Sequence, residues 1–193
     1  MAETPSTMVQ LGTPLPAFEL PDFDGNIHTN NEYDGKPLLV VFMCNHCPFV
    51  KHIVEVFTEK ARQYQEQGVG VVAVNSNDTR SHPQDDPARM KQFAERNGFS
   101  FPYLFDESQD VARRYQAACT PDFFLFDADH KLAYRGQFDA SRPSNRAPVT
   151  GEDLTAAVER VVRGEPAPEP QNPSVGCNIK WKPGNEPSFA TFG

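Results

Sequence analysis

The sequence predicts an α/β fold in which helices flank a mixed central sheet, with an N-terminal β-hairpin extension and a folded-back C-terminal tail. Three observations support this prediction. Two short apolar runs, 38–43 and 70–75, have the composition of strands that are buried on both faces. A helical repeat between them completes a right-handed βαβ unit. Two later strands with a short connection add an antiparallel edge.

The first elements precede the central strand. Residues 1–16 carry little periodicity and are expected to form an extended arm. Residues 18–20 and 27–29 flank an Asp-Gly turn and are expected to pair as a hairpin. Pro37 is tolerated at the start of the next strand, because it removes no hydrogen bond from the strand's interior.

Helical periodicity dominates the middle of the chain. Apolar residues three and four apart predict a helix from 48 to about 67, which the following glycine ends. The polar stretch 79–86 is expected to be a loop whose last residue, Asp86, caps a helix starting at Pro87. After a short strand, residues 106–118 are expected to be helical.

The last part of the domain is a hairpin and a helix. Residues 122–127 and 131–138 are expected to pair as antiparallel strands, and 152–163 has clear amphipathic spacing. We therefore expect residues 1–164 to form one domain, followed by a Pro-rich linker and tail over 165–193.

The tail contains apolar residues between glycines and prolines, namely Cys177, Ile179 and Trp181. A tryptophan ring buries a large apolar surface, so it is seldom left in water. We expect the tail to pack on the domain. The alternative is a loose tail with incidental aromatic residues.

The candidate site is Cys44-Asn-His-Cys47, at the junction between strand and helix. Unpaired N–H groups and the helix dipole stabilise an anion there, so Cys44 is the expected thiolate. His46, when protonated, adds a positive charge. Cys47 is close enough to resolve a mixed disulfide. The pattern indicates thiol–disulfide exchange.

Two other interpretations of the cysteine pair stay open. A C-x-x-C can be half of a zinc site, but such sites usually need a second pair, and the sequence has none. His52 offers only a distant additional ligand. The cysteines can also be structural. His28, His82 and His130 are expected to be surface residues without a role.

Composition limits the partners and the compartment. With 193 residues, 38% of them hydrophobic, the chain fits one α/β domain and an appendage. A formal net charge of −8 argues against nucleic acid or an anionic membrane as partner. No secretory signal or membrane-length apolar run is recognisable, so a cytosolic protein is expected. In a reducing compartment, two cysteines close together in sequence are expected to be catalytic and not a structural disulfide.

The C-N-H-C pair and Cys119-Thr120-Pro121 ahead of the hairpin resemble the thioredoxin superfamily, and more closely its peroxiredoxin-like, AhpC/TSA-related members. This group includes alkyl hydroperoxide reductase and TlpA-type proteins. The resemblance covers about 11–164, and the tail resembles that of one uncharacterised bacterial subgroup. It implies a thioredoxin fold with Pro121 cis against the active disulfide. It also implies that Thr120 pairs with the substrate chain and that Cys119 lies beside the active pair.

The chain departs from the peroxiredoxin pattern P-x-x-x-T-x-x-C. Cys47 occupies the position of the attacking cysteine, but the Pro and Thr positions are Val40 and Cys44. The later active-site arginine is replaced by the 120–121 region. Without these groups peroxide loses hydrogen-bond donors. Thioredoxin's buried carboxylate is Leu38 here, so the Cys47 proton must go elsewhere.

The main interpretation is a cytosolic thiol–disulfide oxidoreductase. Cys44 is expected to attack the substrate disulfide, and Cys47 to resolve the mixed disulfide that forms. His46 is expected to adjust the redox potential, while Thr120 with Pro121 positions the incoming disulfide. The expected partners are protein or small-molecule disulfides and a dithiol electron donor, with no bound cofactor and no metal. His46 also predicts a disulfide more oxidising than that of a thioredoxin.

The alternatives are a thiol peroxidase, with Cys47 attacking peroxide and Cys44 resolving, and a non-catalytic or metal-binding module. A further hypothesis concerns Cys177, which the tail is expected to bring near Cys119 or Cys44 as a resolving or regulatory thiol. The simpler alternative is that it is a small apolar residue of the docked tail.

Overall fold

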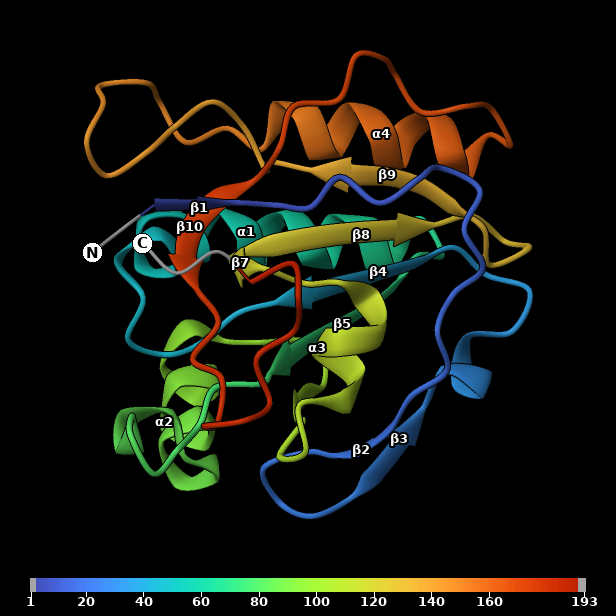
Figure 1. Ribbon diagram of the computed structural model, residues 1–193. Helices are drawn as coiled ribbons and strands as arrows, with labels where there is room; N and C mark the ends of the chain where they lie inside the picture. The colour runs from blue at the N-terminus through green and yellow to red at the C-terminus, as the bar shows by residue number, and fades with distance from the viewer. Residues whose placement is uncertain (1–2, 191–193) are drawn as a thin grey trace.

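The centre of the protein is a five-stranded mixed sheet (Figure 1). The computed structural model describes residues 3–190. The strand order is β6-β5-β4-β8-β9, with bounds β4 (Leu38–Phe42), β5 (Gly70–Asn75), β6 (Tyr103–Phe105), β8 (Asp122–Phe126) and β9 (Leu132–Gly136). Strand β4 pairs in parallel with β5 and antiparallel with β8. Every residue of β4 is buried, which explains its unbroken apolar sequence.

Helices cover both faces of this sheet, which confirms the predicted α/β architecture. They are α1 (Pro48–Glu66), α2 (Pro87–Asn97), α3 (Asp110–Tyr115) and α4 (Glu152–Val162). Leu39 and Val41 join an apolar cluster with buried residues of α1, α2 and α4. Val40 and Phe42 point to the opposite face and pack in a second cluster with α3 and the tail. Within residues 3–190, no helix combines the length and apolar composition needed to cross a membrane.

Two predicted elements are shorter in the structure. The helix expected over 106–118 is only α3, and the Asp106 side chain accepts the N–H of Ala112 at 2.9 Å from the turn before it. The strand expected over 131–138 is only β9. It ends early because the N–H of Gln137 donates to the Asn172 carbonyl at 3.0 Å instead of continuing the ladder with β8.

The N-terminal extension contains more structure than expected. Strands β2 (Glu19–Pro21) and β3 (Ile27–Thr29) form the predicted antiparallel hairpin, and the 3-10 helix η1 (Asn30–Tyr33) follows. The arm predicted over 1–16 includes a short strand, β1 (Glu3–Pro5), which pairs with the tail. The arm therefore takes part in a second sheet.

The C-terminal tail lies against the domain as a strand. Strand β10 (Val175–Asn178) lies between β1 and β7 (Cys119–Thr120) in a sheet of order β1-β10-β7 (Figure 1). Beyond β10, the N–H of Lys180 donates to the Asn77 side chain at 2.9 Å, and Trp181 packs partly buried on the core. The tail thus covers the edge of the domain that carries Thr120.

Candidate active site

Cys44 and Cys47 lie where β4 leads into α1. Strand β4 ends two residues before Cys44, and α1 starts at Pro48 directly after Cys47. Proline suits the first position of a helix, because the N–H that it lacks would have no helical partner there. Cys44 is 1% exposed and Cys47 is 0% exposed. The pair therefore occupies the strand-to-helix junction, with both thiols enclosed by protein.

Strand β7 brings Thr120 against both sulfur atoms. The Thr120–Pro121 peptide bond is cis, as the resemblance implied. The Cys47 thiol donates to the Thr120 carbonyl oxygen at 3.2 Å. The Cys44 Sγ lies 3.7 Å from the Thr120 hydroxyl. A residue far along the chain thus joins the two sulfurs into one site.

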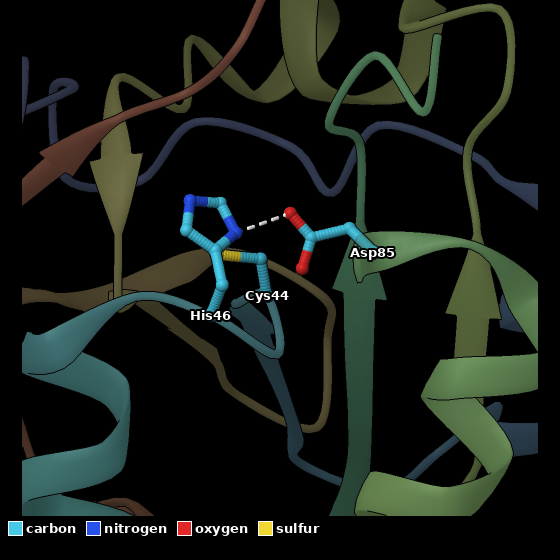
Figure 2. Close-up of side chains that lie close together, drawn as sticks. All are labelled: Cys44, His46 and Asp85. Carbon is cyan, nitrogen blue, oxygen red and sulfur yellow. Dashed lines mark hydrogen bonds and ion pairs between the residues drawn. The ribbon is translucent and has the colours of Figure 1, made fainter. Parts of the chain in front are cut away.

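His46 pairs with a buried carboxylate that the sequence analysis missed (Figure 2). Its Nδ1 lies 2.6 Å from the Asp85 Oδ2 and 3.8 Å from the Cys44 Sγ. The backbone N–H of Asn45 and the side-chain amide of Asn77 also donate to Asp85, both at 2.9 Å. Burial raises the pKa of Asp85, but these hydrogen bonds outweigh it and hold the pKa below its ordinary value. His46 therefore faces an ionised carboxylate.

Asp85 lies in the stretch 79–86 that was predicted as a loop. The structure has a short 3-10 helix there, η2 (Pro83–Asp85). The adjacent Asp86 caps α2, as predicted, by accepting the N–H of Arg89 at 2.9 Å. The capping role explains Asp86 but not Asp85. An aspartate beside the cap with no local role was the only hint in the sequence that Asp85 belongs to the site.

His82 lies in the loop where it was expected, half-buried beside His46. Its ring stacks on that of His46, with the ring centroids 5.3 Å apart. Burial lowers the pKa of His82, and the nearby His46 lowers it further. The sequence analysis did not foresee this contact, because the loop folds back over the strand-to-helix junction and no local sequence pattern marks that long-range approach.

Of the two thiols, Cys47 has the lower pKa. The pKa of Cys47 is held well below its ordinary value by a hydrogen bond with Cys177 and then by one with Cys44, against the cost of burial. The pKa of Cys44 is raised by its hydrogen bond with Cys47, by burial and by the charge of Asp85. The prediction of a Cys44 thiolate is therefore wrong for the resting dithiol. Cys47 is the residue next to the helix start, and Asp85 lies beside Cys44.

The tail brings Cys177 into hydrogen-bond contact with Cys47, which was not predicted, and the sheet register places it diagonally across from Cys119, one of the two predicted neighbours. Strand β10 pairs Cys177 with Thr120 and the next residue with Cys119. Neighbouring residues of a strand point to opposite faces, and the Cys119 Sγ lies 3.7 Å from the Pro121 carbonyl oxygen. Burial raises the pKa of Cys119 well above its ordinary value, which makes it a poor nucleophile.

Cys44, His46 and Asp85 also form a set of potential metal ligands (Figure 2). One ligand atom of each lies within 4.8 Å of the others. A thiolate, an imidazole and a carboxylate suit Zn²⁺ with an open fourth position. His46 and Asp85 already hydrogen-bond each other here, so an ion would have to replace that bond. The structure therefore offers a possible set of metal ligands, but two of them already hydrogen-bond each other.

The fold and the site define a class: a thioredoxin-fold protein with a dithiol at a strand-to-helix junction beside a cis-proline. The chain belongs to the AhpC/TSA family, whose model matches residues 11–135. It is 30% identical over 129 residues to the thiol-disulfide oxidoreductase ResA of Geobacillus thermodenitrificans, a match that spans 67% of this chain and 70% of the relative.

Solved structures share this fold. An uncharacterised conserved protein from Geobacillus kaustophilus is 49% identical with a TM-score of 0.92, over 95% of this chain and 98% of that one. The thioredoxin domain of a thiol-disulfide oxidoreductase from Bacteroides vulgatus is 19% identical with a TM-score of 0.58, over 76% of this chain and 96% of that one. The second likeness concerns the fold alone, and it confirms the thioredoxin fold.

Proposed function

We propose that the protein is a thiol–disulfide oxidoreductase that works through Cys44 and Cys47. The observation that carries this proposal is a hydrogen-bonded pair of cysteines beside the cis-proline Pro121. The similarity to ResA, a named thiol-disulfide oxidoreductase, supports it. The proposed substrates are protein or small-molecule disulfides, and the proposed electron donor is another dithiol.

Cys44 is the proposed nucleophile, although Cys47 has the lower pKa. Cys44 lies next to His46, whose side chain is 19% exposed, whereas Cys47 lies between α1 and the tail. Once Cys47 has ionised, proton transfer along the hydrogen bond between the two sulfurs moves the charge to Cys44. The His46 ring, 3.8 Å away, is then the polar group that faces the thiolate.

The exchange proceeds in two steps. The Cys44 thiolate attacks one sulfur of the substrate disulfide, which forms a mixed disulfide and releases the other sulfur as a thiolate. Cys47 then attacks the Cys44 Sγ, which forms the Cys44–Cys47 disulfide and releases the second substrate thiolate. The protein loses two electrons and two thiol protons, and the substrate disulfide gains the electrons. A donor dithiol restores the reduced protein.

Stopped-flow mixing with a peptide disulfide tests the proposal. The wild type is expected to exchange rapidly, Cys44→Ser to fall to the background rate, and Cys47→Ser to accumulate a mixed disulfide on Cys44. Exchange that persists in Cys44→Ser would give the attacking role to Cys47. Background rates in the wild type itself would overturn the function.

A thiol peroxidase is the second candidate, and the lowered pKa of Cys47 favours it. In this mechanism the Cys47 thiolate attacks peroxide, and Cys44 resolves the resulting sulfenic acid. Mixing the reduced protein with hydrogen peroxide separates the candidates. Fast consumption that requires Cys47 would support the peroxidase, and a slow reaction beside fast peptide exchange would support the oxidoreductase.

A further inference from the structure

At Gly176, strand β10 approaches the backbone of Thr120 more closely than a side chain would allow. A Cβ on Gly176 would lie 2.0 Å from the Thr120 carbonyl oxygen. The next residue, Cys177, is paired with Thr120 in the sheet register. On the other side of Gly176, the Ser174 hydroxyl donates to the Pro121 carbonyl oxygen at 2.5 Å. The tail backbone is thus held against the residue that contacts both sulfurs of the dithiol.

Cys47 and Cys177 converge on Thr120 from different segments of the chain. The Cys47 Sγ lies 3.2 Å from the Thr120 carbonyl oxygen, and Cys177 is opposite Thr120 in β10. Cys177 is 3% exposed, and it hydrogen-bonds with Cys47. Two sulfurs in hydrogen-bond contact need only a small shift to reach the bond length of a disulfide, about 2 Å.

The oxidation state of Cys47 controls how readily Cys177 ionises. In the reduced protein the pKa of Cys177 is raised, first by its hydrogen bond with Cys47, then by burial and by the charge of Cys47. A disulfide at Cys47 leaves a sulfur that cannot ionise, so the hydrogen bond between two thiols and the charge on Cys47 no longer act on Cys177. The positive charge of Lys180, which lowers the pKa, stays. Cys177 therefore becomes a better nucleophile once the dithiol is oxidised.

We propose that Cys177 is a third redox-active thiol, which exchanges with the Cys44–Cys47 disulfide to form a Cys47–Cys177 disulfide. This inference rests on the proposed function, because it starts from the oxidised dithiol. It assigns the tail a chemical role in addition to its packing role.

The step balances without an external oxidant or reductant. The Cys177 thiolate forms a bond with the Cys47 Sγ, the Cys44–Cys47 bond breaks, and Cys44 leaves as a thiolate. The proton that Cys177 lost is taken up by Cys44, so the net charge is unchanged. One disulfide replaces another. The oxidised protein thereby keeps a thiol at Cys44, beside His46, for exchange with a partner.

Disulfide mapping of a Cys44→Ser variant tests this proposal. The variant is oxidised with glutathione disulfide, remaining thiols are alkylated, and linked peptides are identified by mass spectrometry. The variant keeps both Cys47 and Cys177 in place. We expect the Cys47–Cys177 link to exceed the Cys47–glutathione adduct at least about tenfold, because the two protein sulfurs are held together in one site.

The proposal requires this link in the variant and, alongside Cys44–Cys47, in the oxidised wild type. A Cys47–glutathione adduct with Cys177 alkylated would overturn it, as would a wild type in which Cys177 is never linked. Two controls are matched to the variant. Adding Cys119→Ser should leave the link intact, and adding Cys177→Ser should abolish it. Circular dichroism checks that each variant is folded, and the wild-type map provides a test that needs no substitution.

Failure of this inference differs from failure of the proposed function. If the wild type forms a Cys44–Cys47 disulfide and exchanges with peptides while Cys177 stays a thiol, only the third thiol is refuted. If the Cys44–Cys47 disulfide does not form and no exchange occurs, the proposed function is refuted.

Discussion

The site region contains two fully buried aspartates that behave in opposite ways. Asp85, beside His46, has a pKa below its ordinary value despite burial. Burial raises the pKa of Asp122, which directly follows the cis-proline, to about 8. Asp85 accepts from an imidazole, a side-chain amide and a backbone N–H. Asp122 accepts the Ala118 N–H at 3.2 Å, and its Oδ1 has no hydrogen-bond partner among the described residues.

The difference between the two aspartates shows that hydrogen-bond partners, and not burial, decide where charge lies in this site. The Asp85 side carries a negative charge next to Cys44, whereas the Asp122 carboxyl is neutral over most of the pH range below 8. Ionisation is therefore disfavoured at Cys44 and favoured at Cys47, whose pKa is lowered by hydrogen bonds with Cys177 and Cys44. Buried groups with opposite pKa shifts are a recognised way to divide roles within one site.

Replacing the charged aspartate, Asp85, should have the largest effect on stability. Asp85→Ala leaves His46, Asn45 and Asn77 without their common acceptor, and we expect the free energy of unfolding to fall by about 3 kcal/mol. Urea denaturation measures this loss. Asp86→Ala is the matched control, because it removes a helix cap worth about 1 kcal/mol and an exposed ion pair with Arg89 that adds little. Equal losses in the two variants would contradict the importance of the Asp85 network.

The raised pKa of the neutral aspartate, Asp122, predicts that stability depends on pH. The pKa of Asp122 is about 8 when folded and about 3.9 when unfolded, so the folded state binds the extra proton between these values. The contribution of Asp122 to stability is then lost as pH rises from about 4 to about 8. Asp122→Asn mimics the protonated acid, so the variant should gain about 2 kcal/mol relative to wild type between pH 6 and pH 8. Parallel stability curves would show that Asp122 ionises normally.

Gly176→Ala tests the tail contact on the Cys47 side. The new Cβ would meet the Thr120 carbonyl oxygen, so β10 must shift from β7, at a cost of about 1–2 kcal/mol. We also expect faster alkylation of Cys47 by iodoacetamide, because the tail no longer encloses it. Val175→Ala, in the same strand, should leave the alkylation rate of Cys47 close to that of the wild type. An unchanged rate in Gly176→Ala would mean that the tail does not limit access.

The smallest effect is expected on the redox potential. The original expectation was that His46 makes the disulfide more oxidising, but the Asp85 carboxylate beside it acts in the opposite direction. His46→Ala should therefore make the potential more negative by only about 30 mV, or tenfold in the equilibrium constant. Asp85→Asn, which removes a negative charge beside Cys44, should shift the potential the other way. Equilibration with glutathione measures both, and an unchanged potential in His46→Ala removes the argument for tuning by His46.

Much of the fold was predictable because its signals are local. The apolar run at 38–43 followed by Pro48 indicated a buried strand leading into a helix, and the structure has β4 and α1 there. The hairpin, the Asp86 cap and the amphipathic helix α4 also depend on residues a few positions apart. Boundaries were less accurate where a distant group competed, as at Gln137 and Asn172.

The chemistry of the site was only partly predictable. The C-N-H-C pattern identified the dithiol, and the resemblance pointed to the cis-proline at Pro121. The assignment of the thiolate to Cys44 failed because it considered only the helix start and His46. The charge of Asp85 and the sulfur of Cys177 reverse that assignment, and both come from segments far from the dithiol in sequence.

The sequence by itself determined the identity of the reacting groups and the strand-to-helix junction that holds them, because propensity and periodicity act over a few residues. The tertiary structure decided which groups surround each sulfur. Asp85 and His82 arrive through a loop packed over the junction, and Cys177 arrives through a strand inserted between two others. Such contacts depend on register and packing across the whole domain, so no local pattern specifies them.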